Sequence, residues 1–215
     1  VSDVKKSSAP GRFLNRFDQA GWEALNAGDD RGAVENYEKA LSEARNDRER
    51  AATAKNLGNL HYRMGEKAKA EDYLEKAARW NPLDADNQYR LFALYQDRPG
   101  EAVKILESLV RAIPDDFLGW YYLGSTYAHP FNDLDKAADA LERALKIAAG
   151  SAGQAPEEEA AKAAYNLGVV HRAAHRPEEA LRLFRTVVQD HPFSVIAPAA
   201  AVSAAELLLE SRESR

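Results

Sequence analysis

Two histidines at helical spacing are the first candidates for chemistry in this 215-residue chain. His171 and His175 are four residues apart, which places both on one face of a helix, a spacing that can bind a metal ion such as Zn²⁺. No glutamate follows the first histidine, so the pair lacks the metalloprotease pattern His-Glu-x-x-His. We interpret His171 as a packing residue and His175 as a turn residue. The sequence therefore predicts no metal site, and a weak metalloprotein stays an alternative that a metal titration tests.

Other patterns that carry out catalysis are missing from the sequence. Its isolated glycines do not form a phosphate-binding loop, and the Gly-x-Ser-x-Gly elbow of hydrolases does not occur. The acidic groups Asp29-Asp30, Asp115-Asp116 and Glu157–Glu159 precede or begin expected helices, where carboxylates stabilise the positive end of the helix dipole. No set of residues supplies a nucleophile, a base and an oxyanion donor together. We predict a protein that is not an enzyme and has no cofactor.

The composition excludes several classes of partner. The net charge is −5 and no cluster of five basic residues occurs, which opposes nonspecific binding of nucleic acid. No apolar segment approaches the length of a membrane span. The absence of cysteine excludes disulfides and cysteine-based zinc sites but does not choose a compartment. A cytoplasmic protein is slightly favoured. Because the sequence begins Val1-Ser-Asp rather than with Met, an exported or membrane-anchored mature chain stays an alternative.

A column of small residues recurs along the chain and indicates helices that cross closely. Large apolar residues lie four positions after each alanine of the second helix, where they fill the space beside the crossing. The glycine column of the first helices is Gly21, Gly58, Gly124 and Gly168, with Phe92 in the third unit. The alanine column of the second helices is Ala33, Ala70, Ala102, Ala137 and Ala180, followed by Tyr37, Leu74, Leu106, Leu141 and Phe184.

The string from Trp120 to Tyr127 matches the pattern Trp-x2-Leu-Gly-x2-Tyr residue for residue, and Ala137, Leu141 and Ala144 continue it. On these residues the chain resembles the tetratricopeptide repeat family. The resemblance implies an all-α, right-handed helical-hairpin solenoid of about five repeats with a C-terminal capping helix. We place the repeat domain at residues 12–193, a disordered lead-in at residues 1–11 and the capping helix with its tail at residues 194–215. The expected repeats are Arg12–Asn46, Asp47–Asp84, Ala85–Asp116, Phe117–Gly150 and Pro156–Phe193, and the expected capping helix is Ser194–Glu210.

The resemblance also implies where a ligand binds, because the first helices of such repeats line the concave surface of the solenoid. Tyr89, Tyr121 and Tyr165 occupy one column of that surface, and Trp22 and Tyr62 add aromatic area towards the amino terminus. Exposed aromatic side chains with a polar end are favoured anchors for a partner peptide. Tyrosine also packs between neighbouring helices, so a structural role for each of these residues is an equal alternative.

Basic and polar residues form a second candidate group on the same surface. Lys55, Asn59 and Arg63 share one helical stripe, and Arg90 lies on the next helix, so together they can hold a carboxylate. A solvated face without a ligand is the alternative. Chaperone adaptors of this family grip a terminal carboxylate with a defined set of residues, of which Lys55 and Asn59 match the first two. Later positions carry Arg90, Leu118 and Tyr122 instead, so we do not predict binding of chaperone tails.

These observations predict a noncatalytic scaffold that binds a peptide or a helix of a partner protein in its concave groove. One alternative is a homo-oligomeric assembly scaffold, formed when terminal hairpins or the capping helix pair between copies. Another is a regulatory domain of a larger protein. The sequence leaves the partner and the oligomeric state open.

Overall fold

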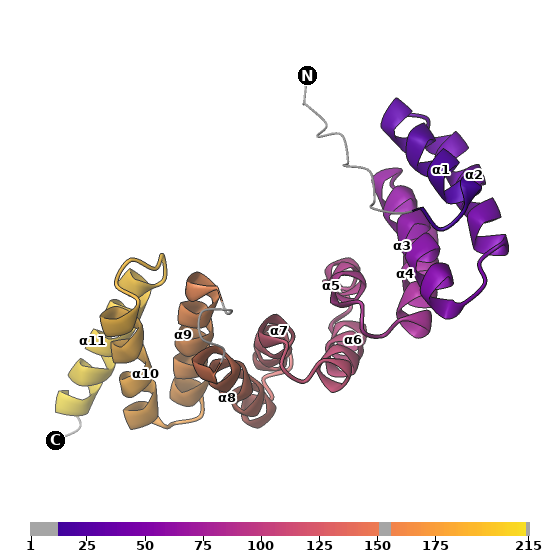
Figure 1. The fold of residues 1–215 in the computed structure, drawn as a ribbon. Coiled ribbons are helices and arrows are strands. Elements are labelled where there is room, and N and C mark those ends of the chain that lie inside the picture. The colour runs from indigo at the N-terminus through magenta and orange to yellow at the C-terminus, as the bar shows by residue number, and fades with distance from the viewer. Residues whose placement is uncertain (1–12, 151–155, 214–215) are drawn as a thin grey trace. The chain divides into compact units, whose positions relative to one another are not determined.

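The computed structural model describes residues 13–150 and 156–213, and these form eleven α-helices without a strand (Figure 1). The expected disordered lead-in falls outside the described residues, as does most of the expected loop after Gly150. In chain order the helices are α1 Arg16–Ala27, α2 Asp30–Ser42, α3 Asp47–Arg63, α4 Lys67–Trp80, α5 Ala85–Leu94, α6 Pro99–Ala112, α7 Phe117–Ala128, α8 Leu134–Gly150, α9 Glu157–Ala173, α10 Pro177–Asp190 and α11 Ala197–Glu213.

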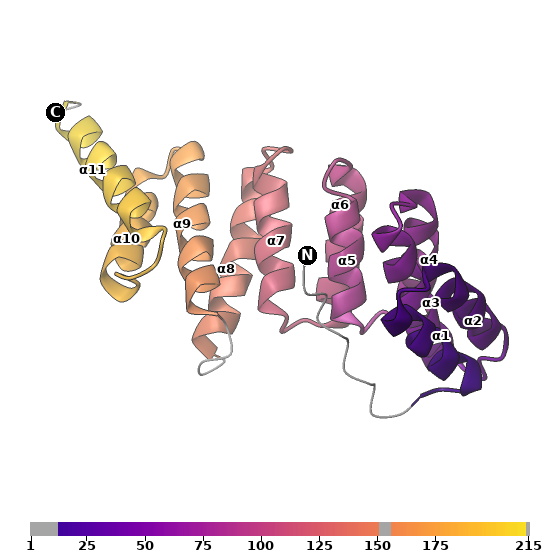
Figure 2. The same cartoon turned by 90° about the horizontal axis from the view of Figure 1, so that it is seen from above.

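The chain divides into two compact units, residues 1–97 and 98–215. In the first unit α1 pairs with α2 and α3 with α4, and α5 follows α4. In the second unit α7 pairs with α8 and α9 with α10, and α11 packs on α10 (Figures 1 and 2). The boundary falls within the predicted third repeat, so α5 belongs to the first unit and α6 to the second. This repeat is also the one that has Phe92 in place of the column glycine.

The glycine column lies at the helix crossings, as predicted. A Cβ atom added to Gly58 would lie 2.6 Å from Cγ of Leu74, and one on Gly124 would lie 2.7 Å from Cγ of Leu141. Both distances are far shorter than a carbon–carbon contact of about 3.5–4.0 Å. The opposing alanines, such as Ala70, are fully buried. Each of the four hairpins that has the column glycine therefore closes around a small residue on one helix and a large side chain on the other.

Local signals in the sequence account for most helix ends. Gly28 and Gly65 follow α1 and α3 with positive φ angles of 81° and 79°, a left-handed conformation that glycine adopts without steric cost. Asn15 and Asn46 accept hydrogen bonds from backbone N–H groups in the first turns of α1 and α3. Pro156 is the N-cap of α9, one position before the helix that it was expected to open.

The helix α11 covers the end of the last hairpin, as the sequence analysis expected of a cap. It runs from Ala197 to Glu213, three residues later at each end than predicted. Ala200, Ala204 and Leu207 of α11 are buried in one apolar cluster with residues of α9 and α10. Because one hairpin cannot bury its own apolar surface, this packing stabilises the end of the second unit.

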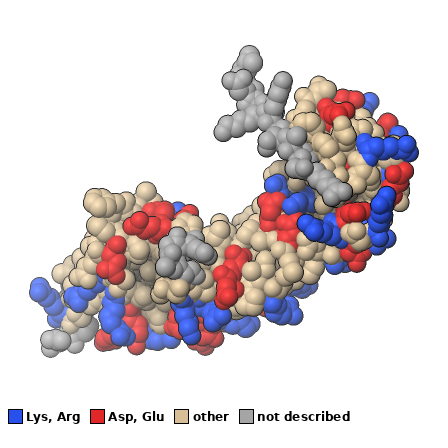
Figure 3. Space-filling view, viewed as in Figure 1, with Lys and Arg blue, Asp and Glu red and all other residues tan. Residues whose placement is uncertain are grey.

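Charges are distributed over the surface of both units. On the faces visible in Figure 3, acidic and basic side chains are interspersed within each unit. Among the described residues, none of the helices has the combination of length and apolar character needed to cross a bilayer.

Candidate protein-binding site

The clearest open polar stripe lies on α3 in the first unit. Asn59 is half-buried, and Tyr62 is 58% exposed. Neither side chain makes a hydrogen bond within the described part of the chain. Lys55 lies one turn before Asn59 on the same stripe, because residues at i, i+4 and i+7 share a helix face. Lys55, Asn59 and Tyr62 therefore lie on one face of α3, while Arg63, which was expected on the same stripe, pairs with Asp30 of α2.

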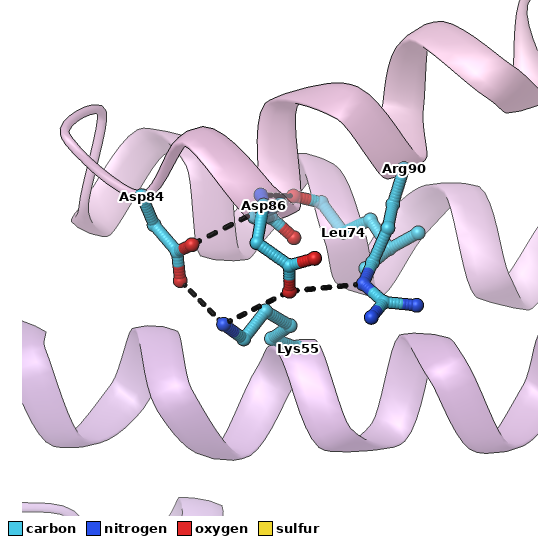
Figure 4. Close-up of polar contacts among 6 residues, drawn as sticks. Lys55, Leu74, Asp84, Asp86 and Arg90 are labelled. Carbon is cyan, nitrogen blue, oxygen red and sulfur yellow. Dashed lines mark hydrogen bonds and ion pairs between the residues drawn. The ribbon is translucent and has the colours of Figure 1, made fainter. Parts of the chain in front are cut away.

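Lys55 is the centre of an ion-pair network that joins α3 to α5 (Figure 4). Its Nζ lies 2.8 Å from Oδ2 of Asp84 and 3.4 Å from Oδ2 of Asp86. Arg90 donates from Nε to the same Asp86 oxygen at 3.1 Å. Burial alone would raise the pKa of Asp86, but the hydrogen bonds and charges of Arg90 and Lys55 outweigh it and hold that pKa below its usual value.

Two features fix the carboxylates in this network. The Asp84 side chain also accepts a hydrogen bond from the backbone N–H of Asn87 at 3.2 Å, so it caps α5. Asn87 is fully buried and donates from its amide to the carbonyl oxygen of Leu74 at 2.9 Å, which ties α5 to α4. The network thus lies where α5 is capped by Asp84 and hydrogen-bonded to α4.

The predicted cations are already paired within the chain. Lys55 and Arg90 share Asp86, and Arg63 forms an ion pair with Asp30 of α2. An incoming carboxylate would meet the negative charge of these aspartates beside each cation. These ion pairs therefore favour a neutral ligand over an acidic one.

The predicted aromatic column is divided between the two units, with Tyr89 on α5 of the first and Tyr121 and Tyr165 in the second. The Tyr121 ring lies 6.2 Å from that of Phe117 and 5.2 Å from that of Tyr122. Tyr165 packs 5.4 Å from Phe184 in the apolar core. Both rings of the second unit thus contribute to packing.

The hydroxyl of Tyr121 belongs to a polar cluster between α7 and α9. Its pKa is raised by burial and by the nearby Tyr122, and hydrogen bonds with Ser125 and Asn166 offset part of that rise. Asn166 also donates to the Ser125 hydroxyl at 3.2 Å. These polar groups are therefore engaged with one another, in contrast to those of α3. The remaining predicted anchor, Trp22, is half-buried on α1, with its ring 5.7 Å from that of Phe13.

Two tyrosines three residues after the column position, which is Phe92 in the third repeat and Gly124 in the fourth, form contacts that were not predicted. Tyr95 donates to Oε1 of Glu75 at 2.6 Å, and Tyr127 donates to Oε1 of Glu107 at 2.5 Å. Each glutamate lies five residues after the column alanine of the preceding repeat, and Glu38 and Glu142 occupy the same position. Burial and the carboxylate together raise the pKa of Tyr127 to about 12. This glutamate column is the sequence signal that predicts the contacts.

His61 and His171 occupy the tyrosine position in the second and fifth repeats, and both are buried, as predicted for His171. His61 is buried, stacks on Tyr73 with ring centroids 5.4 Å apart, and lies 2.7 Å from Glu66 through Nδ1. Burial and the charge of Arg176 lower the pKa of His171. His175, four residues after His171, lies in a turn with a φ of 57°. Within residues 13–150 and 156–213, no three His, Asp or Glu side chains are grouped to hold a metal ion.

Comparison with protein families agrees with this repeat architecture. Three family models, each described as a tetratricopeptide repeat, match residues 51–84, 93–152 and 160–191. The chain belongs to the tetratricopeptide repeat family. Its fold is therefore an all-α helical-repeat solenoid of the kind that serves as a protein-interaction scaffold. A comparison with curated proteins found no match.

Solved structures of other tetratricopeptide proteins share this fold at low sequence identity. MamA is 22% identical, with a TM-score of 0.60 over 80% of this chain and 88% of its own. YrrB, described as a tetratricopeptide protein with an unusual peptide-binding site, is 22% identical, with a TM-score of 0.62 over 87% of this chain and 92% of its own. The C-terminal part of a repeat protein from Cytophaga hutchinsonii is 18% identical, with a TM-score of 0.70 over 90% and 75% of the two chains.

Proposed function

We propose that this protein is a noncatalytic scaffold that binds a peptide or a helix of a partner protein on the first-helix face of its repeats. The α3 stripe of the first unit is the principal site. The observation that carries the proposal is the open side chains of Asn59 and Tyr62, which lie beside the Lys55 network on a rigid pair of helices.

The chemistry of this stripe suits an extended peptide backbone. The amide of Asn59 offers one acceptor and two donors, which match the N–H and C=O groups of a peptide bond. Tyr62 provides an exposed ring for an apolar side chain and a hydroxyl for a polar one. Aromatic residues of this kind dominate the binding energy of many interfaces.

The ion pairs beside the stripe influence which peptide binds. Lys55 and Arg90 are balanced by Asp84 and Asp86, so the site has little net charge. An acidic peptide must compete with Asp86 for Lys55, whereas a neutral peptide leaves the network intact. We therefore expect neutral segments to bind in preference to segments that end in a carboxylate cluster. The peptide-binding site of YrrB, a tetratricopeptide protein of the same fold, supports the general role.

A library of random linear peptides tests this function without knowledge of the partner. Peptides enriched on the full chain would be synthesised and their dissociation constants measured by calorimetry. We expect Asn59→Ala and Tyr62→Ala each to weaken binding about tenfold, because an interface anchor contributes on the order of 1–2 kcal/mol. Tyr62→Phe separates the contribution of the hydroxyl from that of the ring.

Leu83→Ala is the matched control, because Leu83 is an exposed apolar residue of the same unit outside the stripe. It should leave the dissociation constant unchanged. The proposal would be contradicted if the library yields no enriched peptide, or if enriched peptides bind both stripe variants as tightly as the wild type.

A further inference from the structure

The last helix carries two apolar stripes, of which one is buried within the unit. Ala200, Ala204 and Leu207 pack into the core, as described above. Another side of α11 is exposed and also apolar: Val202 and Leu209 are each 59% exposed and Leu208 is 39% exposed. Ala201 and Ala205 lie exposed between them. A helix that is apolar on two sides is typical of one that packs against neighbours on both.

The exposed stripe carries no charge from Pro198 to Leu209, and the exposed Arg212 follows it on the same face in the last turn of α11. Its positions are Pro198, Ala201, Val202, Ala205, Leu208 and Leu209, which recur at the three- and four-residue spacing of one helix face. The nearest acidic side chain, Glu206, lies beside the stripe and pairs with Arg172 of α9 at 2.8 Å. Figures 1 and 2 show α11 as the outermost helix of its unit, with α10 along its inner side.

We propose that the exposed stripe of α11 binds α11 of a second copy of this chain, with the two helices antiparallel. The order of residue sizes along the stripe favours this partner. Small residues, Ala201 and Val202, lie in the amino-terminal half, and the large residues Leu208 and Leu209 lie in the carboxyl-terminal half. Ala205 is at the midpoint between the two groups.

A two-fold axis beside Ala205 makes the stripe complementary to itself. In each half of the interface, Ala201 and Val202 of one copy meet Leu208 and Leu209 of the other. Small side chains thus face large ones, which is how packed helices fill space without gaps. A parallel pair would instead put leucines against leucines at one end and leave a gap between alanines at the other. Antiparallel helices also align their dipoles favourably.

The central alanine allows close approach. Packed helices lie about 8–10 Å apart, and their Cα atoms lie about 2.3 Å from each axis, so the two Ala205 Cα atoms would be separated by roughly 3–5 Å. This range overlaps the roughly 4.4–6.8 Å that a disulfide bridges. Phe193, in the turn before α11, is 98% exposed.

The absence of cysteine from the sequence makes a crosslinking test specific. In an Ala205→Cys variant of the full chain, each copy offers one thiol at the proposed axis. Mild oxidation should join the two thiols into one disulfide, with transfer of two electrons to the added oxidant, oxidised glutathione. We expect most of the protein to become a linked dimer. Leu83→Cys, exposed on the other unit, is the control and should stay largely unlinked.

Sedimentation velocity over a concentration series of the unmodified chain provides an independent test. We expect a monomer–dimer equilibrium whose dissociation constant rises at least tenfold in Leu209→Glu, with unchanged helix content by circular dichroism. A wild type that stays monomeric at all concentrations would overturn the proposal and leave the stripe to a helix from another protein. Equal linking of Ala205→Cys and Leu83→Cys would overturn the antiparallel arrangement.

Discussion

The helices α3 and α7 occupy the same position in their repeats, yet their outward faces differ. Tyr121 of α7 lies where α3 has Lys55, and Ser125 lies where α3 has Asn59. On α7 the aromatic ring packs between neighbours and Ser125 accepts a hydrogen bond from Asn166. On α3 the corresponding amide has no partner within the described residues. The repeat therefore fixes where a side chain lies on its helix. The neighbouring helix then decides whether that side chain packs or remains open to a ligand.

The largest expected effect comes from changes that disrupt the crossing shared by both regions. Gly58→Leu in α3 and Gly124→Leu in α7 should each destabilise the protein by about 3 kcal/mol, because the new side chain would overlap Leu74 or Leu141. Chemical denaturation followed by circular dichroism measures this change. Gly100→Ala is the control, since nothing lies within 4 Å of its added Cβ, and its stability should change little. An unaltered midpoint for both leucine variants would show that the crossings are misplaced.

The second prediction separates packing tyrosines from binding tyrosines. Tyr121→Ala removes a partly buried ring and should cost about 2–3 kcal/mol, whereas Tyr62→Ala should change the free energy of unfolding by no more than about 0.5 kcal/mol. The same denaturation assay compares the two variants. If Tyr62→Ala is the more destabilising, Tyr62 is a structural residue and the contrast between the helices fails.

A third prediction concerns the position three residues after the column glycine, which is Tyr127 in α7 and His171 in α9. Burial lowers the pKa of His171, so the unfolded chain binds a proton at a higher pH than the folded chain does. The free energy of unfolding should therefore decrease as the pH falls from about 6.5 towards the lowered pKa of His171. His171→Tyr should remove this contribution and, by donating to Glu142 as Tyr127 does to Glu107, add about 1 kcal/mol.

Denaturation at a series of pH values measures this effect, with His129→Gln, which replaces a partly exposed histidine of α7's C-cap, as a comparison. The wild type and His171→Tyr should differ in the slope of the free energy of unfolding against pH between neutral and mildly acidic conditions. Identical slopes for the wild type and His171→Tyr would show that the histidine is not buried in its neutral form.

The smallest expected effect is in the ion-pair network of α3 and α5. Asp86→Asn should cost less than about 1 kcal/mol, because Asp86 is largely exposed and such pairs are screened by solvent. The pKa of Asp86 is lowered, so its contribution is complete above the usual aspartate pKa of about 3.9 and is lost as the pH falls through the lowered value. The variant should also bind acidic peptides more tightly, since Lys55 and Arg90 lose a counter-charge. Unchanged acidic-peptide affinity would mean that these cations do not face the ligand.

Much of the fold was predictable from the sequence because it depends on residue size at fixed spacing. Gly58, Gly124 and Gly168 identified the crossings, and the structure places Leu74, Leu141 and Phe184 against them. The positions at which small residues recur in the repeat pattern therefore predict the helix crossings directly.

The division of the third repeat was less accessible, because Phe92 signals an altered crossing without showing which neighbours α5 and α6 take. The pairing of Lys55 with Asp84 and Asp86 was also missed, since it joins residues about thirty positions apart, with the whole of α4 between them. Basic residues that share a surface in the sequence pattern do not show which acidic residues of the same chain pair with them. The apolar outer stripe of α11 was similarly hidden, because a cap was expected to be apolar on one side.

The most direct test of the central claim is to locate a bound peptide by nuclear magnetic resonance. A peptide selected on the full chain would be titrated into isotope-labelled protein, and the shifts of backbone and side-chain amides followed. We expect the largest changes at Lys55, Asn59 and Tyr62 of α3, including the Asn59 side-chain amide. Changes concentrated on the second helices α2 and α4, with α3 unaffected, would contradict this claim.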